Sequence, residues 1–251
     1  MSKLVGSLGK VEDLSQSERH AMLLLMQKYY DNVAEEDFYR DLEEKELAII
    51  MRDSLLGEIR GFSTIMCLDV RTGDQPVRAV FSGDTIVERD FWGENWLVRI
   101  LGGYFMDLIE KYPLMKLYWF LICKGYKTYR YLPLCFRKFY PCFYAETPRA
   151  EKTIIDLLAL LKYPDKYDTS EGIIRSRVKA ARLKRGVADI VSERLKNPHI
   201  DFFSRKNPGH IKGDELACIA ELGRDNFSDL FYRIVLGRRW RILKDEIPEA
   251  D

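Results

Sequence analysis

The spacing of apolar residues changes twice between residues 77 and 123. Residues 77–87 alternate as in a strand, and from Trp96 to Ile109 the apolar residues recur about every 3.6 residues, as on one face of a helix. Residues 116–123 are almost continuously apolar, which is typical of a strand covered on both faces. A strand, a helix and a strand in this order predict a pair of parallel strands joined by a crossover helix.

Other segments extend this pattern on both sides. The capping-box pair Ser15 and Glu18 predicts a first helix, and a short helix is expected at about residues 35–44. Alternating runs at 46–51, 61–70 and 77–87 predict an antiparallel meander of three strands. The remaining predictions are a helix from about Thr128, in which Pro133 either lies in the first turn or makes a kink, a helix over 151–162, an apolar segment at 200–203, a strand over 215–220 and a last helix over about 226–236.

The chain shows no internal repeat and no low-complexity linker. We therefore predict one α/β domain over residues 1–251, with a C-terminal helical extension at about 223–251. Lys and Arg number 40 against 39 Asp and Glu, so the net charge of +1 gives no strong field for nucleic acid.

The composition also bears on location and on metals. No apolar run approaches the roughly 18 residues of a membrane span, and the first residues lack the apolar core of a signal peptide. The five cysteines are scattered in apolar sequence, so we expect reduced core thiols and a cytoplasmic location. The three histidines lie far apart and no CxxC or HExxH spacing occurs, so no metal site is expected.

A polar run with an acidic residue interrupts the strand predicted at 77–87. Strict alternation places Arg78, Ser82, Asp84 and Glu88 on one face, unless Gly83 marks a bulge that breaks the register. Asp84 then has two interpretations: a general base or amine-orienting carboxylate, or a buried acid satisfied by Arg78 or by backbone N–H groups. Glu88 is the second candidate base, and Ser82 is a candidate substrate contact.

The strand, the turn at residues 89–97 with the sequence RDFWGENWL, and the amphipathic helix after it resemble motif A of the GNAT N-acyltransferase superfamily. The order of elements is similar to that fold over about residues 14–222. The resemblance implies a mixed, mostly antiparallel sheet with helices on both faces and a central parallel pair that is splayed.

In that family an acyl-pantetheine lies between the splayed strands, and the amides of the turn bind the donor phosphates. The resemblance therefore implies a donor, either acyl-coenzyme A or an acyl carrier protein, with Val87 and Glu88 along the thioester. The residues that it places around the donor are Val87, Trp92, Gly93, Glu94, Asn95 and Trp96. Trp92, Asn95 and Leu97 depart from the family pattern, and Glu94 disfavours phosphate unless its carboxylate points away.

Residues 116–144 hold eleven aromatic and six basic residues and no acidic one. Any single ring is a core residue by preference, but so dense a set could also wall a long acyl chain, which favours a fatty donor over acetyl. Trp119 and Tyr126 are candidate substrate contacts. A helix from Thr128 would place Tyr129, Leu132, Phe136 and Phe139 on one face. In the GNAT family the helix after the parallel strand often carries a Tyr that protonates the leaving thiolate, and the resemblance points to Tyr129.

Two further features remain. His210 follows Pro208 and Gly209 in a turn, where it can contact substrate or cap nearby backbone. Basic residues gather at 175–185 and again at 238–241. They are solvated faces or a docking surface for an acidic acyl carrier protein.

The sequence thus predicts an N-acyltransferase that moves an acyl group, preferably a fatty one, from a pantetheine thioester to a primary amine of a small molecule or peptide. It is similar in type to the GNAT-like maturases that put fatty acyl groups on ribosomally made peptides. The alternative is an inactive binding module of the same fold for a peptide, a lipid or, less readily at this net charge, RNA.

Overall fold

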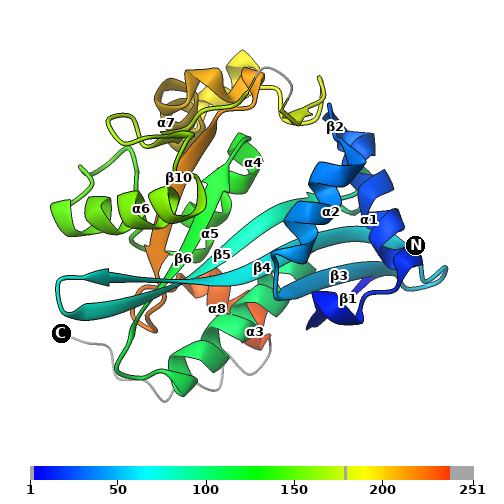
Figure 1. The fold of residues 1–251 in the computed structure, drawn as a ribbon, viewed down its shortest axis with the longest axis horizontal. Helices are drawn as coiled ribbons and strands as arrows, with labels where there is room; N and C mark the ends of the chain where they lie inside the picture. Colours follow the sequence, from blue (N-terminus) through cyan, green and yellow to red (C-terminus); the bar gives the residue numbers. More distant parts are fainter. Residues whose placement is uncertain (1–2, 178–179, 238–251) are drawn as a thin grey trace.

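The computed structural model describes residues 3–177 and 180–237, and within these residues an eight-stranded sheet forms the centre of the molecule (Figure 1). Its strand order is β1-β3-β4-β5-β6-β10-β8-β7. The strands of this sheet are β1 (Leu4–Lys10), β3 (Leu47–Asp53), β4 (Ile59–Thr72), β5 (Gln75–Val87), β6 (Lys116–Cys123), β7 (Tyr167–Asp168), β8 (Ile173–Ile174) and β10 (Glu215–Glu221). A second, two-stranded sheet pairs β2 (Tyr30–Asp31) with β9 (Arg182–Leu183).

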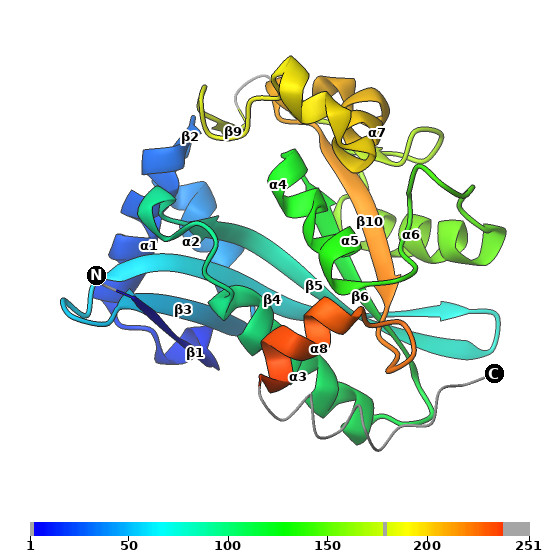
Figure 2. The same ribbon diagram turned by 180° about the vertical axis from the view of Figure 1, so that it is seen from behind.

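Helices lie on both faces of the sheet (Figures 1 and 2). The α-helices are α1 (Gln16–Tyr29), α2 (Glu35–Glu43), α3 (Trp96–Lys111), α4 (Tyr126–Tyr129), α5 (Tyr131–Cys135), α6 (Arg149–Lys162), α7 (Pro198–Lys206) and α8 (Asp229–Leu236). The short 3₁₀ helices are η1 (Val11–Asp13), η2 (Arg89–Phe91), η3 (Ser192–Lys196) and η4 (Pro208–Lys212). Helices α1, α2 and α6 lie on one face, and α3, α5 and α8 lie on the other.

The predicted meander is confirmed, since β3, β4 and β5 are successive antiparallel neighbours. The predicted parallel pair is confirmed as well. Strands β5 and β6 run parallel from the pair Val77 and Lys116 to the pair Ser82 and Leu121, and in the described residues the two strands do not pair with each other beyond that point. Helix α3 makes the crossover between them. The fold is therefore the expected mixed, mostly antiparallel sheet with one central parallel pair.

The period of α3 explains how it packs. Leu97, Leu101, Phe105 and Leu108 recur on one face of the helix and are buried against the sheet. The ring of Phe105 lies 5.6 Å from that of Trp119 on β6. Because β6 is covered on both faces, six of its eight residues are buried, as its apolar run predicts.

The helix expected from Thr128 is divided, and this prediction was wrong in its length. Helices α4 and α5 meet at Arg130, and the chain leaves helical conformation at Phe136, which bridges to Phe227. Pro133 lacks the N–H that a continuous helix would bond to the carbonyl of Tyr129. Two short helices therefore replace the long aromatic face.

Three other boundaries differ from those expected. The edge strand β1 was not predicted, because two glycines dilute its pattern and Leu4 alone in it is buried. The apolar segment at 200–203 lies in α7, which Asn197 caps. The last helix begins at Asp229 because the hydroxyl of Ser228 accepts from the N–H of Phe231. The rest of the expected extension, with the basic run at 238–241, lies outside the described residues.

In residues 3–177 and 180–237, no helix has the length and apolar character to cross a bilayer. All five cysteines lie in this part of the chain as free thiols, and all but Cys67 are buried.

Candidate functional site

Strand β5 carries a bulge at the point where it separates from β6. Ser82 pairs with Ile65 of β4 and Thr85 pairs with Ser63, so Gly83 and Asp84 together oppose the single residue Thr64. Among the described residues neither Gly83 nor Asp84 has a register partner on β6. The structure thus confirms the bulge that the alternation left open, and the four polar residues do not share one face.

Glycine at position 83 allows this bulge to pack closely. A Cβ at Gly83 would lie 2.6 Å from the hydroxyl oxygen of Thr64 and 2.9 Å from Cε of Lys45. Both neighbours are buried, so neither has room to move away. Any larger residue would push β5 away from β4.

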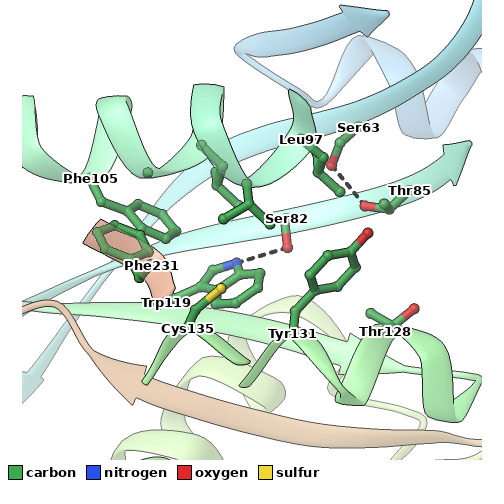
Figure 3. Close-up of a pocket in the computed structure, with 13 residues that line it drawn as sticks. Ser63, Ser82, Thr85, Leu97, Phe105, Trp119, Thr128, Tyr131, Cys135 and Phe231 are labelled. Carbon is green, nitrogen blue, oxygen red and sulfur yellow. Dashed lines mark hydrogen bonds between the residues drawn. The ribbon is translucent and has the colours of Figure 1, made fainter. Parts of the chain in front are cut away.

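On the α3 side of β5, hydroxyl groups surround a small cavity (Figure 3). Ser63 and Thr85 share a hydrogen bond of 2.7 Å, and the indole N–H of Trp119 donates to Ser82 at 2.9 Å. The cavity measures about 20 Å³, and it is otherwise lined by apolar side chains of α3, α5 and α8. This is room for about one water-sized group.

Tyr131 enters this cavity from α5. Figure 3 shows its hydroxyl directed toward Thr85 and Ser63, with Thr128 beside it. Burial raises the pKa of Tyr131 to about 12, so the phenol keeps its proton at neutral pH. The chain therefore places a protonated phenol, which can donate a proton or a hydrogen bond, next to the bulge of β5.

Asp84 acts on the opposite face of the sheet, toward α2 and the end of α6. Burial, with the charges of Asp41 and Glu215, raises the pKa of the Asp84 carboxyl to about 6, while Lys45 and Lys124 oppose the rise. Those two lysines are paired elsewhere, Lys45 with Asp41 and Lys124 with Glu215. Within the described chain no hydrogen bond or ion pair holds the Asp84 carboxylate, and a pKa near 6 suits a general base.

Three hydroxyl groups lie near Asp84. The Thr64 hydroxyl is buried and unbonded within the described residues, and a Cβ on Gly83 would touch it. Burial raises the pKa of the Tyr30 and Tyr163 phenols, and the negative charge of Asp84 raises both pKa values further. This face therefore offers a carboxylate and three hydroxyls to a polar ligand.

The edge of β5 beyond the bulge is open toward the gap. The N–H of Glu88 donates to the carbonyl of Arg60 on β4 at 2.7 Å. Because hydrogen-bonded and non-bonded pairs alternate in an antiparallel ladder, the backbone groups of Thr85 and Val87 point away from β4, toward the side where β6 has diverged. The carbonyl of Val87 accepts the indole N–H of Trp92 at 2.8 Å, in agreement with this orientation.

The turn before α3 keeps some of the expected features. Gly93 has φ +104°, a left-handed conformation that favours glycine. Asn95 stands at the N-cap without a side-chain hydrogen bond to the first turn that Trp96 begins, so in the described structure those N–H groups have no such cap. The carboxylate of Glu94 accepts the N–H of Leu4 at 3.0 Å and thus points toward β1.

Glu88 forms ion pairs outside the cavity. Its buried carboxylate pairs with Lys28 and, at 2.9 Å, with Arg60. These residues line a groove of about 490 Å³ between α1 and the β3–β4 turn. With two cations on it, Glu88 is not positioned as a free base, so the structure brings Asp84 but not Glu88 to the bulge.

Three other expected site residues lie away from the cavity. The hydroxyl of Tyr129 donates to the carbonyl of Pro141 at 2.9 Å, and its ring packs against Phe203. Tyr126 is buried in the main core. The ring of His210 lies 5.6 Å from that of Phe203, and burial lowers the pKa of His210. Because α4 ends at Tyr129, the residue that enters the cavity is Tyr131, which the sequence reading did not single out as a site residue.

The aromatic segment is mainly core. Of its eleven rings, all described, only Phe143 and Tyr144 are exposed. Trp119 packs between Phe105 and Phe136, with ring distances of 5.6 and 5.7 Å, and closes the base of the cavity. The rings pack on one another and leave no chain-sized space at the described cavity.

The basic stretch at 175–185 is bonded to the body of the protein. Arg175 pairs with Asp168 and Asp214, and Lys184 donates to the carbonyl of Gln27 on α1. Lys179 lies outside the described residues. Among the residues described, no group of three His, Cys, Asp or Glu side chains is arranged to hold a metal ion.

No family model matches the sequence, and no curated protein matches it. Among solved structures the chain is similar to a GNAT family N-acetyltransferase (YhbS) from Escherichia coli in complex with CoA, with TM-score 0.39, 14% identity, and coverage of 52% of this chain and 68% of that one. The chain is also similar to glucosamine-6-phosphate N-acetyltransferase from Arabidopsis thaliana, with TM-score 0.36, 17% identity, and coverage of 51% of this chain and 89% of that one. A third similar structure is Arabidopsis thaliana NAA60 in complex with a bisubstrate analogue, with TM-score 0.38, 12% identity, and coverage of 57% of this chain and 92% of that one.

The first of these structures carries the name of the family that residues 89–97 resemble. The candidate site itself rests on the strand topology and on the side chains described above.

Proposed function

We propose that this protein is an N-acyltransferase that transfers an acyl group from a pantetheine thioester to a primary amine. One observation carries the proposal. Where β5 leaves β6, a bulge sends an unpartnered carboxylate, Asp84, to one face and leaves hydroxyls and the phenol of Tyr131 on the other. An amine and a thioester that meet in such a gap have a base on one side and an acid on the other.

The donor would lie along the open edge of β5. The backbone groups of Thr85 and Val87 face the gap, and an N–H there can hold the oxyanion that develops on the thioester carbonyl. A coenzyme A thioester or the thioester of an acyl carrier protein supplies the activated acyl group, and both occur in the cytoplasm. The turn at residues 92–96 borders this edge, and the Glu94 carboxylate is turned away from it.

The acceptor would approach from the face of Asp84. An alkylammonium must lose a proton before it attacks, and a carboxylate with a pKa of about 6 is mostly ionised at neutral pH and can take that proton, directly or through water. The nitrogen then bonds to the acyl carbon while the carbon–sulfur bond breaks. The hydroxyls of Thr64, Tyr30 and Tyr163 would orient the rest of a small molecule or peptide.

The thiolate that leaves needs a proton. Tyr131, whose pKa of about 12 keeps it protonated, faces the cavity at this point and is our candidate acid in place of Tyr129.

The size of the cavity bears on the acyl group. At about 20 Å³ it has room for a methyl-sized group, which supports a short acyl donor better than the fatty one that the aromatic density favoured. A fatty chain would require the rings that line the cavity, among them Phe231 on α8, to move. Thermal shift with acetyl-, octanoyl- and palmitoyl-coenzyme A compares the three, because a ligand of the native state raises its stability.

Asp84→Asn tests the function. We expect acyl transfer to fall by about 100-fold or more while donor affinity changes little. Asp69→Asn is the matched control, because it removes a surface carboxylate of β4 that pairs with Arg78 on β5, the strand that also carries Asp84. If the wild-type protein binds thioester or peptide but transfers nothing to any of a panel of amines, the binding module is the better description.

A further inference from the structure

Three cations gather beside the gap between β5 and β6. Arg89 belongs to η2, which follows β5, and Lys127 belongs to α4, which follows β6. Arg194 comes from η3, in the segment between β8 and β10. The charges of Arg89 and Arg194 both act on Lys127, and with burial they lower its pKa to about 8. We call Arg89, Lys127 and Arg194 the cation cluster.

An aromatic ring, and no carboxylate, contacts two members of this cluster. The Nζ of Lys127 lies 3.1 Å from the centroid of the Trp92 ring, and the guanidinium carbon of Arg89 lies 5.2 Å from it. Arg89 also donates to the carbonyl of Gly186 at 2.8 Å. In the part of the chain that the structure describes, none of the three cations forms an ion pair.

This arrangement is unfavourable without a ligand. Three like charges repel one another, and Lys127 is half-buried, so its ammonium has lost part of its hydration. Other cations near the gap are paired with carboxylates: Lys124 with Glu215 and Arg60 with Glu88. An anion bound between the three side chains would compensate their charges and replace the lost hydration with charge-assisted hydrogen bonds.

The position indicates which anion. Arg89 lies just after the end of β5 and Lys127 lies at the start of α4, so the two residues stand on either side of the open edge where the pantetheine arm would lie. The turn at residues 93–96 offers uncapped N–H groups and no cationic side chain, and its Glu94 carboxylate points toward β1, whereas the cation cluster carries full positive charges. A phosphate at the far end of a pantetheine arm therefore meets a more favourable field at the cluster than at the turn.

We propose that Lys127, Arg89 and Arg194 bind the phosphate of the donor, a phosphorylated pantetheine thioester, and that the contact between Lys127 and Trp92 opens when the phosphate arrives. The proposal rests on the proposed function for its ligand. The shared chemistry is a phosphate ester of pantetheine, present as a diphosphate in coenzyme A and as a single phosphodiester on a carrier protein.

Isothermal titration calorimetry at low salt tests the proposal with three probes: inorganic pyrophosphate, coenzyme A and 4′-phosphopantetheine. We expect Lys127→Gln to weaken the binding of pyrophosphate and coenzyme A by about tenfold or more. Lys196→Gln is the matched control. It lies two residues from Arg194, is exposed and pairs with Glu193, so its affinities should stay within about twofold of wild type.

Lys127→Arg guards against a folding defect, because it keeps the charge and should retain binding. No binding of pyrophosphate or coenzyme A to the wild-type protein, or equal binding by Lys127→Gln, overturns the proposal. Similar affinity for coenzyme A and 4′-phosphopantetheine indicates that a single phosphate suffices, as on a carrier protein. Much tighter binding of coenzyme A indicates the diphosphate.

The two proposals fail in different ways. If anion binding depends on Lys127 but the protein transfers no acyl group, the cation cluster is supported and the proposed acyltransferase function is refuted. If the protein transfers an acyl group but its anion binding does not depend on Lys127, the function is supported and the cation cluster is refuted.

Discussion

Ser82 and Asp84 are two residues apart on β5, yet they serve opposite faces of the sheet. Ser82 accepts the indole N–H of Trp119 at the α3-side cavity, while Asp84 interacts with charges that come from α2, β10 and the end of β6. A regular strand would place both on one face. The extra residue at the bulge separates them, and so it puts the candidate base and the candidate acid on opposite sides of the same gap.

The bulge should depend on the missing side chain of Gly83. Gly83→Ala brings a Cβ within 2.6 Å of the Thr64 hydroxyl oxygen, and we expect a loss of roughly 1–3 kcal/mol in the free energy of unfolding. Urea denaturation measures it. Gly103→Ala is the control, because no atom lies within 4 Å of its added Cβ and alanine favours the α3 helix by about 1 kcal/mol. Equal stability of the two variants would contradict this account of the bulge.

The pKa of Asp84 predicts how stability changes with pH. The folded value of about 6 is above the ordinary 3.8, so the folded state binds the proton more tightly than the unfolded state. The contribution is fully present below about pH 4 and is lost as the pH rises through about 6. Compared with Asp84→Asn, the wild-type protein should lose roughly 1–3 kcal/mol of stability between about pH 4 and pH 8.

Denaturation of both proteins across this range measures the difference. Asp69→Asn is the control and should differ from the wild-type protein by a constant amount over this range, because the hydrogen bond from Arg78 lowers the pKa of Asp69 below its ordinary 3.8 and its contribution is lost only in more acidic solution. Parallel curves for wild type and Asp84→Asn would mean that Asp84 does not titrate in this window. The same titration predicts that acyl transfer rises with pH through about 6, as the base ionises.

Two tyrosines two residues apart allow a test of the acid. Tyr131→Phe removes the hydroxyl that faces the cavity, and we expect acyl transfer to slow by about 10- to 100-fold with donor affinity retained. Tyr129→Phe removes a hydrogen bond to Pro141, and we expect about 1 kcal/mol lower stability with transfer unchanged. Single-turnover kinetics distinguish them, and the reversed pattern would return the role to Tyr129.

Local patterns predicted most of the fold. The change of period around residues 87–97 gave α3 and the parallel pair, because burial on one face of a helix and both faces of a strand leaves different spacings. The same patterns could not give β1, whose pairing with β3 depends on an edge far away in the sequence. They also could not divide α4 from α5, because Pro133 fits the first turn of a helix as well as a kink, and local spacing does not distinguish the two.

The site was predictable only in part for the same reason. Asp84 was visible because an acid inside an apolar strand is costly and calls for a cause. Tyr131 and Tyr129 look alike in sequence, and the division of the helix decides which one reaches the cavity. Lys127 was one basic residue among six in the segment, and its lack of an acidic partner is a tertiary property.

Glu88 should prove structural. Glu88→Gln leaves Lys28 and Arg60 without their shared carboxylate, and we expect the free energy of unfolding to fall by roughly 1–3 kcal/mol. Because these groups line the α1 groove and not the cavity, the turnover of the folded fraction should stay near wild type. Thermal unfolding beside activity assays measures both. A large fall in turnover without a loss of stability would restore Glu88 as a base.

The cation cluster predicts a loss of anion binding in alkaline solution. Arg89 and Arg194 are the charged groups that act on Lys127, and both favour its neutral form, so its pKa of about 8 lets it lose its charge above that pH. Pyrophosphate affinity should therefore fall as the pH rises through about 8 and above, since a bound anion itself favours the charged amine. Lys127→Arg keeps its charge throughout, because an arginine does not titrate in this range. Calorimetric titrations from about pH 7 to pH 10 should show a steep decline for the wild-type protein and no decline for Lys127→Arg. The same decline in both would assign the effect to another group.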